Sequence, residues 1–255
     1  MMASGNFDPA YFGPLSAAET RHFWFRARNR VIAEILRQLT QSPQNGYRVL
    51  EVGCGTGNAL RLLECVCSRG TVVGMDLFAE GLKFARSRTK CALVQGDISH
   101  SPFRAQFDLI GLFDVLEHLP DDQKVLSDLH NLLAPGGRLI LTVPAFFFLW
   151  SYFDQVSHHC RRYGLSDLED KLTRAGYAVE YLTPYMTSLF PAVWLRRFAH
   201  VLRAADAPVL GELRIVPGLN ELLLWLLSLE IPFIVRRRRL PFGTSLLTIA
   251  RKRMN

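Results

Sequence analysis

Short apolar runs alternate with amphipathic segments through the middle of the 255-residue chain. The apolar runs predict β-strands at residues 47–52, 71–75, 92–96, 107–113, 138–144 and 177–183. Between them, apolar side chains recur at helical spacing and predict helices at residues 58–66, 79–88, 121–133 and 166–175. Strands that alternate with helices indicate βαβ units, and therefore a mainly parallel sheet with helices on both faces.

The two ends of the chain depart from this alternation. TRHFWFRARNRVIAEILRQL, residues 20–39, predicts an N-terminal amphipathic helix, and residues 185–243 contain two long apolar helical stretches. Residues 243–252 predict a last strand, antiparallel to the strand before it. We therefore expect an α/β, Rossmann-like sheet of seven strands. Its four segments would be an N-terminal helical lid (1–45), a core (46–184), a helical cap (185–243) and the final strand with a basic tail (244–255).

The turn after the first predicted strand carries three glycines at alternate positions, Gly53, Gly55 and Gly57. Ligands bind parallel α/β sheets at the carboxyl ends of the strands, and glycine lets a ligand approach the main chain. Asp76 ends the second predicted strand, where its carboxylate can accept hydrogen bonds from both ribose hydroxyls. The turn lacks a P-loop lysine, and its GxGxG spacing disfavours a nicotinamide dinucleotide. The pattern predicts a site for adenosine without phosphates.

Five segments in order resemble the class I S-adenosylmethionine-dependent methyltransferases: VLEVGCGTG, VVGMDL, VQGDI, FDLIGLFDVLEHL and LLAPGGRLILTVP. The close resemblance spans roughly residues 47–145. It implies S-adenosylmethionine as cofactor, S-adenosylhomocysteine as product, and methyl transfer to an oxygen, nitrogen or carbon nucleophile of an acceptor. HFWFRARNRVI is similar to an N-terminal segment that closes over the cofactor in a subset of these enzymes, where Arg28 would pair with the methionine carboxylate.

The resemblance also implies which residues contact the cofactor. Asp76 would hold the ribose, Leu77 would pack on adenine, and Asp97 and Ile98 would bracket the adenine edge. The full set of implied cofactor-binding residues is Trp24, Arg28, Glu51, Gly53, Gly55, Gly57, Asp76, Leu77, Asp97, Ile98 and Phe113.

Candidate catalytic residues lie in two segments. His118 follows the fourth predicted strand, and Asp154, His159 and Tyr163 belong to FDQVSHHCRRYG, which we expect to form a loop at the rim of the crevice. An oxygen or amine nucleophile must lose a proton. We expect His159 to assist, with His118 second and Asp154 orienting. A subset of the methyltransferases shows a similar Asp…His…Arg-Arg-Tyr segment, which His159 and Tyr163 match.

Structural roles for the same residues stay open. His118 can simply end its strand and support the next helix, and the rim segment can be a solvated loop whose arginines pair with nearby acids. We predict no metal site, because His158, His159 and Cys160 are too close together for one tetrahedral site without ligands from elsewhere.

The net charge of +7 is concentrated in local arginine clusters. The sequence carries no motif that reads nucleic acid, so we expect no nucleic-acid partner. Glu221, Glu230 and Pro232 interrupt the second late apolar stretch and argue against a membrane crossing. One interpretation of residues 185–239 is a peripheral membrane contact, with Trp225 at the interface and Arg236 to Arg239 toward anionic headgroups. The other is a helical lid packed on the sheet or on a second subunit of a homodimer.

The apolar cap favours a bulky, hydrophobic or lipid-like small molecule as acceptor. The binding motifs also suit a second function, a cofactor-binding partner or regulatory subunit without activity. The five cysteines are irregularly spaced and predict reduced thiols, and the opening residues do not resemble a secretory signal. We therefore expect a cytoplasmic protein, located at the inner face of a membrane if the cap contacts lipid.

Overall fold

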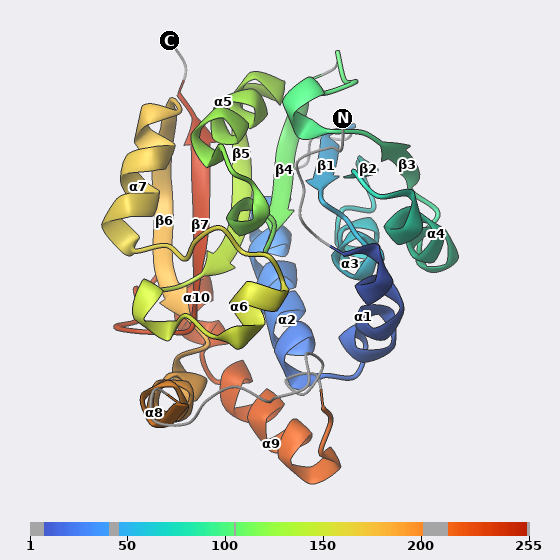
Figure 1. The fold of residues 1–255 in the computed structure, drawn as a ribbon. Helices are drawn as coiled ribbons and strands as arrows, with labels where there is room; N and C mark the ends of the chain where they lie inside the picture. Colours follow the sequence, from blue (N-terminus) through green and yellow to red (C-terminus); the bar gives the residue numbers. More distant parts are fainter. Residues whose placement is uncertain (1–7, 41–45, 105, 201–213, 254–255) are drawn as a thin grey trace.

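The computed structural model describes residues 8–40, 46–104, 106–200 and 214–253. One seven-stranded sheet has the order β3-β2-β1-β4-β5-β7-β6 (Figure 1). Its strands are β1 Arg48–Val52, β2 Thr71–Asp76, β3 Ala92–Gln95, β4 Phe107–Phe113, β5 Leu133–Pro144, β6 Tyr177–Tyr185 and β7 Ser245–Lys252. The strands from β3 to β5 pair in parallel, whereas β7 is antiparallel to both β5 and β6. The predicted fold class, including the antiparallel last strand, is confirmed.

Helices cover both faces of the sheet (Figure 1). The helices of the core are α2 Phe23–Leu39, α3 Asn58–Val66, α4 Ala79–Arg88, α5 Asp122–Leu132 and α7 Leu165–Arg174. Successive side chains of a strand point to opposite faces. In β1, Val49 accordingly packs in the cluster with α2 and α3, while Leu50 packs in the cluster with α5 and α7. Both residues are fully buried, so this alternation places one hydrophobic core on each side of the sheet.

The chain reverses its direction of winding between β1 and β4, which are neighbours in the sheet. From β1 the order continues outward through β2 and β3, and from β4 it continues the other way through β5. The carboxyl ends of β1 and β4 therefore mark the switch point, which is where open α/β sheets bind their ligands. The glycine turn and the segment after β4 both begin at this edge.

The N-terminal segment packs on this core. Ile32, Ile35 and Leu36 of α2 are fully buried, so α2 belongs to the helix layer rather than to a detached lid. The shorter α1, Phe12–Glu19, is preceded by the 3-10 helix η1, Pro9–Tyr11. It lies over the glycine turn, because a Cβ atom on Gly55 would be 3.6 Å from the ring of Phe12. The part of this segment that covers the cofactor edge is therefore α1.

Two local predictions are wrong. Strand β5 begins at Leu133, whereas we expected a helix to end there and the strand to start only at residue 138, so APGG is part of the strand, with Gly136 at φ +73° and a register irregularity opposite it in β4. The rim segment is not a loop throughout, because residues Tyr152–Val156 form the short helix α6. A capping box between Ser151 and Asp154 stabilises the start of α6.

The predicted cap forms helices α8 Phe190–His200, α9 Pro217–Ser228 and α10 Ile231–Val235. Residues 201–213 of the cap lie outside the described residues. The stretch Pro217–Val235 is long and apolar enough to cross a membrane by length and composition, and 28% of its most apolar window is buried. The interruptions at Glu221, Glu230 and Pro232 therefore do not shorten it below the length of a span. The same helices pack on α2, where the Asn220 side chain accepts a hydrogen bond from the Phe23 amide (2.8 Å).

Candidate active site

The glycine turn has a backbone conformation that requires glycine. Gly53, Gly55 and Gly57 have φ values of +70°, +50° and +79°. A Cβ atom on Gly53 would lie 2.5 Å from the Val115 side chain, and one on Gly57 would lie 2.9 Å from the Ala85 backbone. The amides of Gly53 and Cys54 both donate to the Met75 carbonyl, which joins the turn to the end of β2. The turn is therefore a rigid platform at the carboxyl end of β1.

Asp76 connects the turn to the next strand. Its Oδ2 accepts a hydrogen bond from the Gly55 amide (2.7 Å), and its Oδ1 accepts one from the Phe78 amide (2.8 Å). Burial raises the pKa of Asp76, although the bonds from the Phe78 and Gly55 amides oppose this effect. Each carboxylate oxygen has a second lone pair, so the group can also accept from two ribose hydroxyls.

Arg28 reaches from α2 to the segment after β4. Its Nη1 donates to Asp114 Oδ2 at 2.7 Å, and the guanidinium contacts the rings of both Trp24 and Phe25, 5.3 Å and 5.5 Å from their centroids. Burial alone would lower the pKa of Arg28, but the charge and the hydrogen bond of Asp114 raise it. Asp114 itself has φ +55°. The sequence alone did not predict this ion pair between α2 and the segment after β4.

Two buried polar atoms at this edge have no hydrogen-bond partner among the described residues: Arg28 Nε and Glu51 Oε2. Glu51 is 3% exposed on β1, and burial raises its pKa well above the usual value while the charge of Arg28 opposes the rise. An amino-acid moiety offers a carboxylate for the arginine and an amino group for the glutamate. The residues present therefore fit the methionine part of S-adenosylmethionine, while Asp76 fits its ribose.

The other implied cofactor residues occupy different environments. Ile98 is buried, and Asp97 is partly exposed at the end of β3, where its Oδ1 accepts from the Ser99 amide and starts the 3-10 helix η2, Ile98–His100. Leu77 is partly exposed, and its carbonyl accepts a hydrogen bond from Gln95. Phe113 instead lies within the core, with its ring over Gly111 of its own strand. Its ring is therefore a core side chain at the end of β4, next to the segment that carries Asp114.

The rim segment leaves the sheet at β5 and returns to it. Ala145 and Tyr163 form an isolated parallel bridge, and Tyr163 donates its amide proton to the Pro144 carbonyl. These bonds close the excursion that holds the 3-10 helix η4, Phe147–Leu149, together with α6 and His159. The Cys160 amide donates to the Glu117 carbonyl, so the excursion also lies beside the segment that follows β4.

Asp154 is the centre of this segment and is fully buried. Its Oδ1 bonds to His159 Nδ1 (2.9 Å) and accepts from Arg162 Nε (2.7 Å), while Oδ2 accepts from the amide and the hydroxyl of Ser151. Burial would raise the pKa of Asp154, but the hydrogen bonds from His159 and Arg162 hold it well below the usual range. Asp154 is thus a carboxylate that fixes the ring of His159 by one nitrogen and leaves Nε2 as a proton acceptor.

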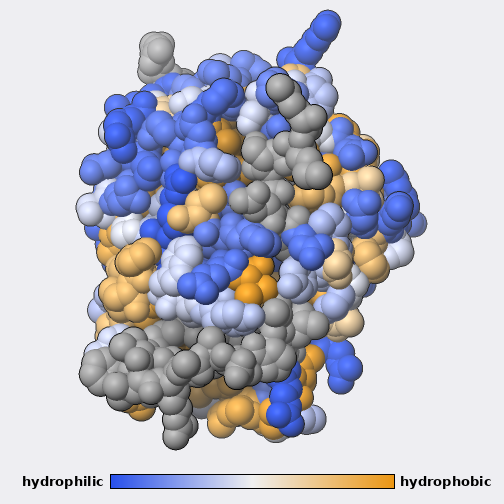
Figure 2. Space-filling model, in the orientation of Figure 1, coloured by the Kyte–Doolittle hydropathy of each residue, from blue (hydrophilic) through white to orange (hydrophobic). Residues whose placement is uncertain are grey.

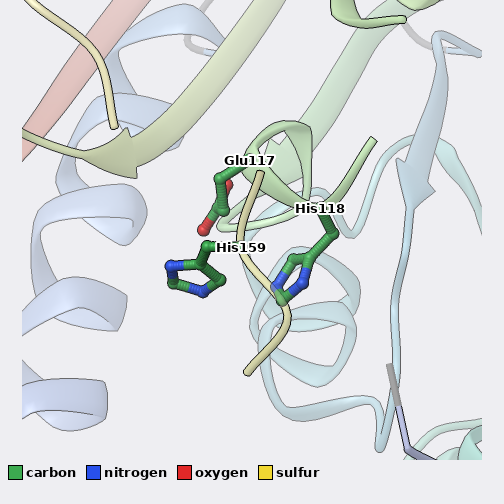
Figure 3. A group of neighbouring side chains, drawn as sticks. All are labelled: Glu117, His118 and His159. Carbon is green, nitrogen blue, oxygen red and sulfur yellow. The ribbon is translucent and has the colours of Figure 1, made fainter. Parts of the chain in front are cut away.

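Glu117, His118 and His159 meet at the end of the 3-10 helix η3, Leu116–His118 (Figure 3). The two imidazole rings lie edge to face with their centroids 4.6 Å apart, and the Glu117 carboxylate points toward His159. One possible ligand atom from each residue lies within 4.8 Å of those of the other two, so the three side chains could hold a metal ion. From the sequence we considered His159 only together with His158 and Cys160, and did not identify Glu117 and His118 as further ligands. Sequence reasoning also missed Glu117, which is 1% exposed.

The low pKa of His118 argues against this histidine as the proton acceptor. Burial and the neighbouring His159 lower the pKa of His118 to about 3, so it is a weak base. Burial and the charge of Asp114 raise the pKa of Glu117 well above its usual value. Asp114 also pairs with Arg28, so Glu117 and the two histidines lie close to the residues that are predicted to bind the cofactor.

Tyr163 lies away from the crevice. It is fully buried, and its hydroxyl donates to Asp122 Oδ2 (3.0 Å) and to the Leu116 carbonyl (3.3 Å). Burial raises the pKa of Tyr163 beyond any value at which it could exchange a proton near neutral pH. The geometry gives Tyr163 the position of an anchor for the rim segment.

Replacing Tyr163 with phenylalanine is therefore expected to lower the free energy of unfolding by about 1 kcal/mol, the usual contribution of one such hydrogen bond. Asp122 keeps its ion pairs with Arg161 and Lys171, so the fold should persist. Urea denaturation followed by circular dichroism measures the loss, and methyl transfer should continue at close to the wild-type rate. A rate loss of about 100-fold without a change in stability would instead assign Tyr163 a catalytic role.

The fold and the site together define a nucleoside-binding α/β protein whose crevice accepts an amino acid joined to adenosine. Residues 23–182 match the family model described as "Methyltransferase domain". The chain belongs to this family, the class I S-adenosylmethionine-dependent methyltransferases, whose cofactor is S-adenosylmethionine.

Individual relatives cover smaller parts of the chain. It is 31% identical over 126 residues to the demethylmenaquinone methyltransferase of Staphylococcus epidermidis, which covers 45% of this chain and 52% of the relative. It is 36% identical over 107 residues to the ubiquinone biosynthesis O-methyltransferase of Psychrobacter arcticus, covering 38% and 40%. The chain thus spans about half the length, or less, of these curated relatives.

A solved structure shares the fold over nearly the whole chain. It comes from the complex between the Haloferax volcanii Trm112 methyltransferase activator and a methyltransferase. The TM-score is 0.63 at 20% identity, with 99% of both chains covered. At that identity the similarity shows the architecture only.

Proposed function

We propose that this protein is a methyltransferase that moves the methyl group of S-adenosylmethionine to a nucleophile of a small hydrophobic acceptor. The observation that carries the proposal is the position of the Asp154–His159 pair, which stands beside Glu117 and Asp114 at the same edge as the predicted cofactor residues. A base at that position can take a proton from an acceptor in the crevice.

The chain's residues divide the work between binding and proton transfer. Arg28 and Glu51 would hold the amino-acid end of S-adenosylmethionine, and Asp76 its ribose. Bound there, the cofactor supplies a sulfonium methyl group that is open to in-line attack. His159 would accept the proton that the acceptor's nucleophile loses, and Asp154 would stabilise the resulting imidazolium. Most of the rate enhancement would come from positioning and from the exclusion of water.

Aromatic side chains next to the rim segment support a bulky apolar acceptor. The rings of Phe146 and Phe148 stack with centroids 5.3 Å apart, and Phe190 of α8 lies against both Phe148 and Phe242. Phe146 and Phe148 belong to the same excursion from the sheet as His159, between Ala145 and Tyr163. Two relatives are named for quinone biosynthesis, which is consistent with an isoprenoid or another lipid-like ring as the acceptor class.

The proposal is tested by incubating the purified protein with S-adenosylmethionine whose methyl group is deuterated, together with fractionated cell extract. We expect one component of the lipid fraction to gain a trideuterated methyl group, with the wild type but not with the Asp76→Ala variant. Cofactor binding without any labelled product would favour the alternative, a cofactor-binding subunit without activity. Tight binding of NAD in place of S-adenosylmethionine would overturn both.

A further inference from the structure

The large exposed apolar side chains in the part of the chain that the structure describes all come from segments that follow β5, and Figure 1 places α6, α8 and α9 of these segments toward the end to which the parallel strands point. These side chains come from η4 and α6, from α8, and from the stretch that contains α9 and α10. They are Phe147, Phe148, Tyr152, Trp194, Leu195, Val216, Leu219, Leu222, Trp225, Leu229, Phe233 and Phe242. We call them the apolar end. In Figure 2 hydrophobic residues gather at the lower edge, where Figure 1 places α9. An apolar area of this extent marks an interaction site.

Helix α9 shows why the apolar end needs a partner. On one side Asn220, Leu224 and Leu227 are buried against the body of the protein. On the other side Leu222 and Trp225 are 52% and 58% exposed. A surface helix of a soluble protein normally carries polar residues on its outer side. One apolar side of α9 therefore packs on the protein, as a lid would, whereas the other side has no cover within the described residues.

The charges around the apolar end are mostly positive. Arg214 precedes α9 and is exposed, and Arg236, Arg238 and Arg239 follow α10 and are exposed as well. Arg30 of α2 lies beside α9, where it donates to Ser228. The two acidic residues of α9 and α10 add little negative charge to this surface. Glu221 forms an ion pair with Arg26, and Glu230 is buried, where it accepts a hydrogen bond from the Ser188 amide.

We propose that the apolar end binds the surface of a lipid bilayer that contains anionic lipids. Its aromatic and leucine side chains would enter the boundary between headgroups and acyl chains, and its arginines would contact the anionic headgroups. The positive charge favours a membrane over a second copy of the chain, because two such ends facing each other would bring like charges together.

The packing of α9 and α10 indicates that they lie on the membrane rather than cross it. Crossing would break the bond from the Phe23 amide to the Asn220 side chain, and the bonds from the amide and hydroxyl of Ser188 to Glu230. Crossing would also bring the Glu230 carboxyl group into the hydrocarbon, where an ionisable side chain is unfavourable.

This orientation has a consequence for the crevice. The carboxyl ends of the parallel strands point toward the same end of the molecule as α8 and α9 (Figure 1). A bilayer bound there would lie next to the rim segment, so an acceptor dissolved in the membrane could reach His159 without crossing water.

Flotation with vesicles tests the proposal on the full-length protein. We expect the wild type to float with vesicles of phosphatidylcholine mixed with phosphatidylglycerol, and more weakly with phosphatidylcholine alone. Trp225→Glu should lose binding to both by at least about tenfold, because it places a charge on the inserted face. Thr173→Glu on the exposed side of α7 is the matched control and should bind as the wild type does.

The electrostatic part has its own variant pair. Arg238→Gln with Arg239→Gln should reduce partition onto the anionic vesicles by about 10- to 30-fold, since each arginine near such a surface contributes about fivefold. Arg86→Gln with Arg174→Gln removes the same charge from exposed sites on α4 and α7 and should have little effect.

Thermal melting and S-adenosylhomocysteine binding check that each variant is folded, and neither depends on the vesicles. If the folded wild type fails to float with either vesicle, the proposal is wrong. It is equally wrong if light scattering shows a dimer that Trp225→Glu converts to a monomer while vesicle binding stays absent, because a second copy then covers the apolar end.

Discussion

Replacement of Asp76 with alanine is expected to weaken the binding of S-adenosylhomocysteine by about 100-fold or more. The carboxylate would accept two hydroxyls of the ribose, and a hydrogen bond to a charged group contributes about 1.5–3 kcal/mol, so losing two removes at least about 3 kcal/mol. The variant also leaves the amides of Gly55 and Phe78 without their acceptor, which loosens the glycine turn. Isothermal titration calorimetry measures the affinity directly and requires no knowledge of the acceptor.

Asp108→Ala is the matched control for the structural part of this loss. The Asp108 carboxylate also accepts a backbone amide, from Arg48 at 2.7 Å, but it lies at the opposite end of β4 from the crevice. Both variants lose a carboxylate that holds a backbone amide, and only Asp76→Ala should lose the cofactor. Equal affinities for the two variants would show that Asp76 does not contact the ribose.

The sequence predicted the sheet and the cofactor edge because both depend on local signals. Alternating apolar runs fix strands and helices, and the three glycines and Asp76 stand at strand ends that must meet at one edge of a parallel sheet. Only the strand boundary at Leu133 went against the local signal. There, pairing with Phe107 of β4 extends β5 back through APGG, and a glycine with positive φ accommodates the irregularity.

Contacts between distant segments could not be predicted in the same way. Arg28 and Asp114 are 86 positions apart, and their ion pair depends on how α2 crosses the sheet edge. Tyr163 stands in a polar segment that we expected to form a loop at the rim, yet it is buried and its hydroxyl bonds to Asp122, 41 positions earlier in the chain. Periodicity likewise shows that α9 is apolar on most sides, but not which side the protein covers.

The choice of proton acceptor also depends on contacts between residues that are distant in the sequence. His118 and His159 were alternatives in sequence, and the structure places them edge to face. Their environments separate their roles, because burial and the neighbouring His159 make His118 a weak base whereas Asp154 orients His159 from its Nδ1 side. A histidine held by a buried carboxylate is an arrangement suited to general base catalysis.

We therefore expect His159→Asn to lower kcat for methyl transfer by about 100- to 10,000-fold, the usual contribution of a general base. Cofactor affinity should stay at the wild-type value, since the ring does not belong to the residues that hold the nucleoside. The measurement is the rate at which the labelled methyl group appears in the extract fraction that contains the acceptor, with the acceptor fraction and the cofactor in excess over the enzyme.

His158→Asn is the neighbouring control. His158 is exposed with φ +54°, and asparagine tolerates that conformation well, so this substitution should change neither the rate nor the fold. His118→Asn should lower the rate far less than His159→Asn, because a group with a pKa of about 3 contributes little as a base near neutral pH.

Treatment with EDTA decides whether Glu117, His118 and His159 hold a metal ion or His159 acts as a base. An unchanged rate supports the base, whereas loss of activity that a divalent cation restores would convert all three residues into metal ligands and remove His159 from proton transfer.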